Sequence, residues 1–475
     1  MLFNSFEFIV FLIVVFVLYW FVFSKDLRLQ NGLLLVASYV FYGWWDYRFL
    51  GLILMSTIVD YGAGRALGRA RGKRARKVIL LCSVVFNIAL LGFFKYFNFF
   101  ITSSVDLLEA LGYTVSSITT LNIILPVGIS FYTFQTMSYT IDVYRGQLKP
   151  TKDFVSFAAF VSFFPQLVAG PIERATNLLP QIAQKRSFRY AQGVDGLRLI
   201  LWGLFKKVVI ADSLAPDVDY IFAHYTDVGS GTLMLGAVYF AIQIYGDFSG
   251  YSDIAIGVSK LFGFELMSNF RFPYFSRNIA EFWHRWHISL STWFRDYLYF
   301  PLGGSRVARP KAIRNVFIIF LVSGFWHGAN WTFLIWGAIH ALLYLPSFFL
   351  KTNAKFKGTV VAQDKRWPTA AETLRMITTF SLVTLAWIFF RSANVNHAWG
   401  YLKGIFTQWE VGLSMTNGLV YVALLLVFEW KLRPNERTIV FSGKRWVRYA
   451  VYVALGAVIY QKLFTSDMQF IYFQF

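Results

Sequence analysis

The sequence predicts an all-α, polytopic membrane protein with roughly twelve transmembrane helices plus re-entrant and amphipathic helices. Three observations support this fold class. Hydrophobic residues make up 57% of the 475 residues and aromatic residues 20%, and the mean hydropathy of +0.51 is far above that of a soluble domain of this length. Apolar segments of about 20 residues, the length that crosses a bilayer, recur along the chain. Short clusters of Lys and Arg separate these segments.

The distribution of positive charge predicts the orientation of the helices. The formal net charge is +20, but the basic residues occur in short clusters and not on one soluble domain, which argues against nucleic acid as a partner. Lys and Arg accumulate in cytoplasmic loops and attract anionic lipid, so we expect a lipid bilayer as the partner. The expected cytoplasmic clusters lie at 25–28, 65–77, 145–152, 174–189, 306–314, 351–366 and 431–448.

Counting apolar segments between these clusters gives the predicted crossings. The outer loops should be acidic or nearly uncharged, as are the segments 103–120, 212–227 and 392–416. Both chain ends then lie outside. The crossings are expected near 6–23, 30–45, 49–64, 78–98, 122–144, 196–214, 232–260, 315–328, 331–350, 373–390, 416–430 and 447–464.

Two further features complete the predicted organisation. The apolar segment 154–169 contains Pro165 and has basic residues on both sides, so a re-entrant hairpin suits it better than a crossing. The pattern contains no soluble domain, low-complexity stretch or convincing repeat, so we predict one membrane domain over 1–475. The single cysteine, Cys82, excludes a disulfide within these residues.

One histidine lies deep in the predicted membrane region. The sequence GFWHGANW at 324–331 places His327 13 residues beyond the basic run that ends at Arg314, which is about 20 Å of helix within a layer about 30 Å thick. An ionisable side chain at that depth is costly and is therefore a functional candidate. An imidazole can take the proton of a hydroxyl that attacks an acyl group, so we predict a general base. The alternative is a core histidine bonded to a carbonyl group.

The segment 281–300 is predicted to form an amphipathic helix at the inner membrane surface, because its Trp, Leu and Tyr residues recur at helical spacing. Packing against other helices and anchoring at the membrane surface explain most residues of this segment. The exception is His284 and His287, which at i and i+3 could project together toward a cavity. Two histidines without a third nearby ligand do not make a zinc site, so we predict no metal.

The segment 243–253 contains several polar residues within a predicted crossing. Asp247, Tyr251 and Asp253 at such depth must be hydrogen-bonded to one another, to the backbone or to cavity water. Two interpretations remain open. The segment either clamps two helices together, with glycines that allow close approach, or lines a pore.

Five motifs, in matching order over nearly the whole chain, closely resemble the membrane-bound O-acyltransferase family, in the branch of bacterial alginate and related O-acetyltransferases. They are PVGISFYTFQ at 126–135, GPIER at 170–174, DFSGYSD at 247–253, FWHRWHISLSTWFRDYLY at 282–299 and GFWHGANW at 324–331. The resemblance implies that His327 is the essential histidine of the family and that His287 corresponds to the histidine of its second motif. It also implies a central tunnel across a bacterial inner membrane.

The last six residues, FIYFQF at 470–475, resemble a terminal motif of this branch and of the small partner protein in teichoic-acid alanylation. The resemblance implies that Tyr472 carries the acyl group. The predicted topology independently places this end outside, just past a final crossing. The alternative is an aromatic tail packed at the membrane interface, where Tyr is common.

These inferences combine into one expected reaction. No cofactor is expected to be bound. Acetyl-CoA is too polar to cross a bilayer, so the donor would bind at a basic inner vestibule near Arg285 and Arg295, and only acetyl would pass through. His327 would activate the Tyr472 hydroxyl, while His287 would orient or polarise the thioester. Further substrate contacts are expected from Trp326, Asn330, Tyr251 and Asp253.

The final acceptor is expected to be a polysaccharide such as alginate or peptidoglycan, reached through a periplasmic partner that resembles the SGNH hydrolases. Two alternatives stay open. The enzyme could transfer directly to a lipid or protein hydroxyl, or the chain could be a solute transporter, although no inverted repeat of broken helices supports transport.

Overall fold

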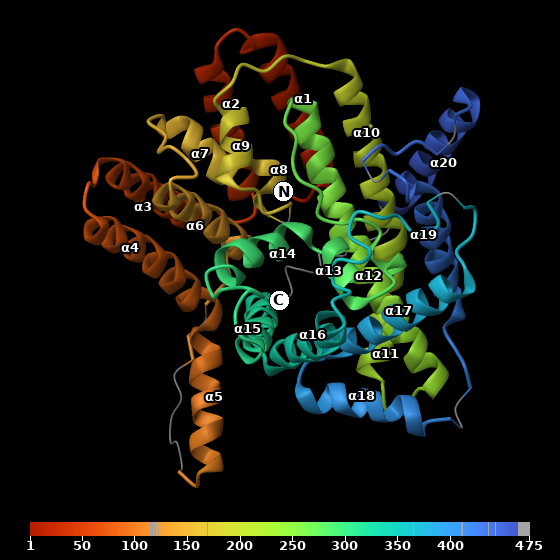
Figure 1. The fold of residues 1–475 in the computed structure, drawn as a ribbon. Coiled ribbons are helices and arrows are strands. Elements are labelled where there is room, and N and C mark those ends of the chain that lie inside the picture. The colour runs from red at the N-terminus through yellow and green to blue at the C-terminus, as the bar shows by residue number, and fades with distance from the viewer. Residues whose placement is uncertain are drawn as a thin grey trace. The chain divides into compact units, whose positions relative to one another are not determined.

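The regular secondary structure of the described part of the chain is entirely helical, with no strand among these residues (Figure 1). The structure, a computed structural model, describes residues 1–463 apart from 114–119, 122, 169, 364, 410–411, 436 and 442. Tyr472 and the motif at 470–475 lie outside the described residues. The helices form two compact units, one of Met1–Tyr190 with Ser259–Leu266, and one of Ala191–Val258 with the chain from Met267 onward. The single membrane domain over 1–475 stays a prediction.

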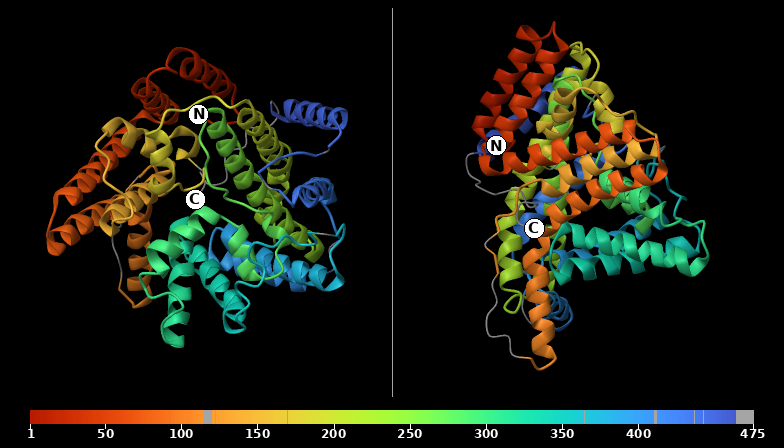
Figure 2. Two further views of the ribbon diagram at one scale, coloured as in Figure 1. Left: turned by 45° about the horizontal axis from the view of Figure 1, so that its top comes forward. Right: turned by 90° about the vertical axis from the view of Figure 1, so that its left-hand side faces the viewer.

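The first unit contains α3, α4 and α6, which pack side by side in the ribbon views (Figure 1, Figure 2). Its elements are α1 Phe6–Val17, η1 Leu18–Val22, α2 Leu27–Gly43, η2 Tyr47–Phe49, α3 Leu50–Arg69, α4 Lys73–Leu91, η3 Gly92–Tyr96, α5 Phe97–Ala110, α6 Ile129–Arg145, α7 Phe154–Ser162, α8 Phe164–Leu167 and α9 Ala175–Ile182. The short helices α7 and α8, broken at Phe163, occupy the segment predicted to be a re-entrant hairpin.

A buried carboxylate joins these three helices. Asp60 of α3 accepts hydrogen bonds from Ser83 Oγ at 2.5 Å and Asn87 Nδ2 at 2.8 Å, both on α4, and from Thr140 Oγ1 of α6 at 2.8 Å. These bonds offset the cost of burying the carboxylate among apolar helices.

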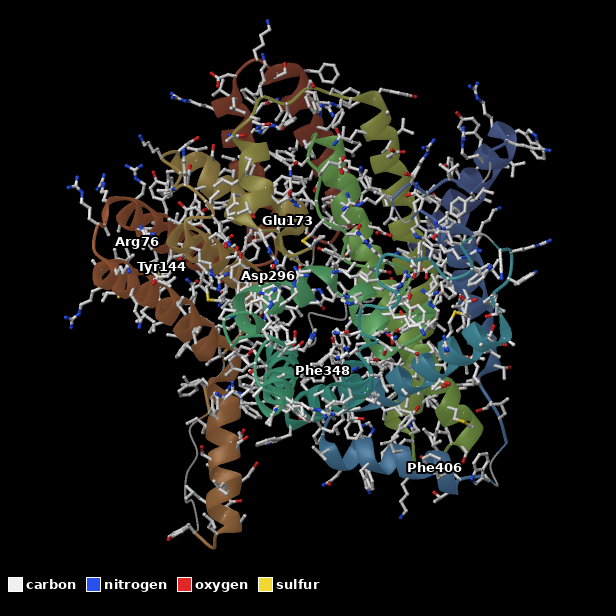
Figure 3. The ribbon with its side chains drawn as sticks, in the orientation of Figure 1. Arg76, Tyr144, Glu173, Asp296, Phe348 and Phe406 are labelled. Carbon is white, nitrogen blue, oxygen red and sulfur yellow. The ribbon has the colours of Figure 1, made fainter. Side chains whose placement is uncertain are left out.

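One arginine of the basic segment 65–77 also has a structural role. Arg76 of α4, which is labelled beside Tyr144 in Figure 3, donates to the carbonyl oxygens of Leu67 at 2.7 Å and Tyr144 at 2.9 Å. These carbonyls belong to the last turns of α3 and α6, where a positive charge is favourable.

The second unit carries the predicted functional residues. Its elements are α10 Tyr190–Leu204, η4 Phe205–Ala211, α11 Asp212–Ala223, α12 Ser230–Leu261, η5 Pro273–Phe275, α13 Ile279–Arg285, α14 Ile288–Phe294, η6 Arg295–Tyr299, α15 Arg309–His327, α16 Trp331–Phe349, α17 Ala370–Arg391, α18 Val395–Thr407, η7 Thr416–Gly418, α19 Leu419–Leu432 and α20 Arg445–Leu463. The last turn of α12 belongs to the first unit.

Four helices of the described residues are long and apolar enough to cross a membrane: Tyr47–Arg69, Lys73–Ala110, Trp331–Phe349 and Ala370–Arg391. The total of roughly twelve crossings and the central tunnel stay predictions. One boundary was wrong, because the helix predicted over 78–98 continues to Ala110 and includes part of the segment expected to be an outer loop. No glycine or proline interrupts residues 93–110, so the helix has no local reason to end.

The single amphipathic helix predicted over 281–300 is also wrong. The chain forms two short helices, α13 and α14, which are separated at Trp286 and His287. His287 has φ +42, a left-handed conformation that ends α13 and redirects the chain. Consequently His284 and His287 do not share one helix face.

Candidate active site

His327 is the last residue of α15, and the close packing of α15 against α16 fixes its position. A Cβ atom at Gly324 would collide with the carbonyl oxygen of Phe333, and one at Gly337 would collide with that of Phe320. Glycine is therefore required at both positions for the helix backbones to approach this closely. The apolar sequence of α15 forms the helix, and Gly328 with its extended backbone ends it.

Aromatic rings surround the His327 imidazole. Its ring centroid lies 4.9 Å from that of Trp326, 5.3 Å from that of Trp336 and 5.3 Å from that of Phe390. The residue is only 4% exposed. These rings exclude bulk water, which strengthens any electrostatic interaction at the imidazole.

His287 reaches the same cluster from the junction between α13 and α14. Its ring centroid lies 6.2 Å from that of His327 and 5.9 Å from that of Trp326, and the residue is fully buried. The ring of Phe248, from α12, packs edge-on against it at 4.7 Å. The structure therefore brings His287, His327 and Trp326 together, while their catalytic and substrate-binding roles stay predictions.

Asn269 determines which nitrogen of His287 carries the proton. The Oδ1 atom of Asn269 accepts hydrogen bonds from the backbone N–H of Ser289 at 3.3 Å and from Ser289 Oγ at 2.9 Å. A backbone N–H can only donate, so this amide oxygen must face His287 as an acceptor. His287 Nδ1, at 3.0 Å from the same oxygen, must then be the protonated nitrogen.

The other nitrogen of His287 is consequently a bare acceptor. Its Nε2 atom has no hydrogen-bond partner among the described residues. Burial lowers the pKa of His287 to about 3, so the ring is neutral near pH 7. A neutral Nε2 can accept a proton or a hydrogen bond but cannot donate one.

Asn269→Leu should lower acyl-transfer turnover by about tenfold to hundredfold, because the Nδ1 proton loses its acceptor and the tautomer is no longer fixed. Asn269→Asp keeps the acceptor but adds a negative charge that raises the pKa of His287. Because neutral His287 is the active form, the acidic limb of the pH–rate profile should then move to higher pH. A profile of Asn269→Asp that matches the wild type would contradict this role.

The other predicted substrate contacts are engaged within the protein. Arg285 donates to the Glu281 carboxylate at 3.0 Å and to the carbonyl oxygens of Arg271 and Thr359. Arg295 forms an ion pair with the neighbouring Asp296, which is labelled in Figure 3, at 2.7 Å.

Asn330 caps the start of α16 by accepting from the Thr332 N–H at 3.0 Å, and it donates to the Ala393 carbonyl at 2.9 Å. His284 Nε2 lies 3.2 Å from the carbonyl oxygen of Asn353. Substrate contacts by Asn330, Arg285 and Arg295 stay predictions.

The polar residues of 243–253 face lysines that the sequence analysis did not single out. Asp253 Oδ2 lies 2.7 Å from Lys206 Nζ. Asp247 Oδ1 lies 2.7 Å from Lys207 Nζ, and Asp212 shares the same ammonium group at 2.8 Å. Tyr251, on the same helix, is buried. Among the described residues, this arrangement favours the interpretation that the segment clamps helices together.

Close backbone packing accompanies these ion pairs. Gly203 of α10 and Gly250 of α12 face each other, and a Cβ at either position would lie against the other's carbonyl oxygen. On the same helix, Tyr245 donates to Glu429 Oε1 of α19 at 2.6 Å. Substrate binding by Tyr251 and Asp253 stays a prediction.

Besides Lys206 and Lys207, two further buried residues of this unit were missed, His340 and Asn269. His340 lies within the crossing predicted at 331–350, so the membrane-depth argument used for His327 could have found it. Asn269 lies outside the predicted crossings and has no sequence signal, because its role depends on contacts made only in the folded chain. Among the described residues, no group of three His, Cys, Asp or Glu side chains is placed to hold a metal ion.

Comparison with known proteins agrees with this arrangement of residues. Residues 151–389 match the model of MBOAT, the membrane-bound O-acyltransferase family. The chain is 43% identical over 392 residues to a probable alginate O-acetylase, AlgI, of Azotobacter vinelandii, covering 82% of this chain and 75% of the relative. It is 41% identical over 407 residues to the probable alginate O-acetylase AlgI of Pseudomonas aeruginosa, with 84% and 75% covered. A peptidoglycan O-acetyltransferase of Helicobacter pylori is 36% identical over 399 residues, with 78% and 73% covered.

Proposed function

This chain belongs to the membrane-bound O-acyltransferase family and is a polytopic membrane acyltransferase, and we propose that it carries acetyl groups across a bacterial inner membrane. The donor is cytoplasmic acetyl-CoA, and the acetyl group is destined for an extracytoplasmic polysaccharide. The named relatives, which are an alginate O-acetylase and a peptidoglycan O-acetyltransferase, support both the acetyl group and the class of acceptor.

The observation that carries the proposal is the buried pair of His287 and His327. His327 takes the proton from an acceptor hydroxyl as its oxygen attacks the thioester carbon. The C–S bond then breaks, an oxygen ester forms, and His327 returns the proton to the departing thiolate. The neutral His287 accepts a hydrogen bond at Nε2 from an N–H or O–H group of the bound substrates other than the proton that His327 takes, and so orients them. This arrangement supports orientation by His287 over polarisation of the thioester, which would need a donor at Nε2.

Tyr472 is the proposed acceptor in this reaction, although it lies outside the described residues. A phenol with a pKa near 10 is a poor nucleophile while neutral, so it needs a base such as His327. The acetyl-tyrosine ester would pass its acetyl group to a periplasmic transferase resembling the SGNH hydrolases, and from there to a sugar hydroxyl.

Intact mass spectrometry of the purified full-length protein with acetyl-CoA tests the relay. Wild type should gain the mass of one acetyl group, and Tyr472→Phe should gain none. Tyr460→Phe is the matched control, because Tyr460 is an exposed tyrosine on the C-terminal helix α20 and its variant should still be acetylated. An adduct that persists in Tyr472→Phe would exclude this tyrosine as the carrier.

A wild-type protein that gains no mass but acetylates an added lipid or protein hydroxyl would indicate direct transfer. Uptake of an intact solute by vesicles, without covalent transfer, would indicate a transporter.

A further inference from the structure

His340 is a fully buried histidine that the proposed reaction does not use. It lies on α16, and its ring is 4.8 Å from that of Trp336 and 6.2 Å from that of Phe282. The indole Nε1 of Trp283 on α13 donates to its Nδ1 atom at 3.3 Å.

This hydrogen bond fixes the tautomer of His340. An indole N–H can only donate, so Nδ1 of His340 must be the unprotonated nitrogen. The proton of the neutral ring is then on Nε2, and Nε2 has no hydrogen-bond partner among the described residues. A buried donor without an acceptor is destabilising, so an acceptor supplied by a bound ligand would explain why this donor is present.

The position of His340 indicates which part of a ligand would approach it. His340 lies one helical turn, or about 6 Å, beyond Trp336 on α16, and Trp336 contacts the ring of His327. From His340 the helix continues to Phe349 and then to the basic segment 351–366, which is expected to be cytoplasmic. His340 therefore lies between the reacting histidine and the side from which the donor would enter.

We propose that His340 Nε2–H donates to the first amide carbonyl of the pantetheine arm of the acyl donor. The proposal rests on the proposed function. In such a thioester this carbonyl is separated from sulfur by two methylene groups and the amide nitrogen, a distance close to one helical turn. Among the aromatic rings around His340, this donor would replace the water that the amide leaves behind. His287 as a fixed acceptor and His340 as a fixed donor would then recognise two different parts of the substrates.

Two variants and two donors test the proposal with the full chain in membranes. Glutamine reaches the position of histidine Nε2 and retains an N–H there, whereas asparagine reaches only the position of Nδ1. The donors are S-acetyl-N-acetylcysteamine, which has the first pantetheine amide, and an alkyl thioacetate of equal length, which has none. The readout is the rate of thiol release above that of membranes lacking the protein.

Wild type and His340→Gln should prefer the amide-bearing donor by about tenfold in kcat/KM, which is the effect of one such hydrogen bond. His340→Asn should lose this preference while keeping its rate with the alkyl donor. An unchanged preference in His340→Asn, or an equal fall with both donors, would overturn the proposal. If wild type releases no thiol from either donor or from acetyl-CoA, the proposed function itself fails, and that outcome is distinct from the others.

Discussion

Replacing His327 with alanine should lower acyl-transfer turnover by about a hundredfold to ten-thousandfold, the usual contribution of a positioned general base. In the cluster of Trp326, Trp336 and Phe390, His327 is the group placed to take a proton beside His287. Bulk water is excluded from it, so solvent cannot efficiently replace the lost base. The rate of acetyl transfer from acetyl-CoA in membranes that contain equal amounts of each variant measures the effect.

Two controls separate this loss from a folding defect. His284→Ala removes a histidine whose Nε2 lies 3.2 Å from the Asn353 carbonyl, away from the aromatic cluster, and it should keep most of the turnover. His327→Gln fills most of the imidazole volume, so it should melt near the wild-type temperature yet remain as inactive as the alanine variant. If His327→Gln retains a tenth or more of the wild-type turnover, His327 is not the base.

The two histidines differ in how far the sequence could predict them. Membrane depth alone identifies His327, because depth follows from the distance along an apolar helix to a basic cluster. For His287 the sequence singles out the residue but predicts the wrong local geometry. A helix over 281–300 would place it beside His284. The left-handed break at His287 is instead accompanied by bonds from His287 and Ser289 to Asn269, which lies 18 residues earlier in the chain. Long-range contacts of this kind leave no periodic signal.

The polar residues of 243–253 show a similar limit. The sequence establishes that these polar groups must have hydrogen-bonding partners within the membrane, but it cannot identify the partners. A helix clamp and a pore lining are therefore equally consistent with the sequence. The sequence does place Lys206 and Lys207 within the crossing predicted at 196–214, but it does not show which residues they contact. Only the approach of α10 to α12 at Gly203 and Gly250 shows that these lysines meet the carboxylates.

Lys207→Met should lower the free energy of unfolding of the protein by about 3–5 kcal/mol, the usual cost of removing one partner from a buried ion pair. The ammonium group lies 2.8 Å from Asp212 and 2.7 Å from Asp247, and all three side chains are almost fully buried. Methionine nearly preserves the volume but leaves two close carboxylates without this charge. Denaturant unfolding of the protein in detergent micelles measures the change. Lys206→Met should cost less, because the side chain of its partner Asp253 is 20% exposed.

A compensating variant distinguishes a clamp from a pore lining. Lys207→Met combined with Asp212→Leu and Asp247→Leu removes the whole charge cluster, and an apolar replacement of a buried ion network is often neutral or stabilising. If the cluster only holds helices together, this triple variant should recover both stability and turnover. If Asp247 lies on a path used by a substrate, the triple variant should regain stability but remain inactive, and the clamp interpretation would be wrong. Because stability and turnover are measured on the same protein, each result supports only one of the two interpretations.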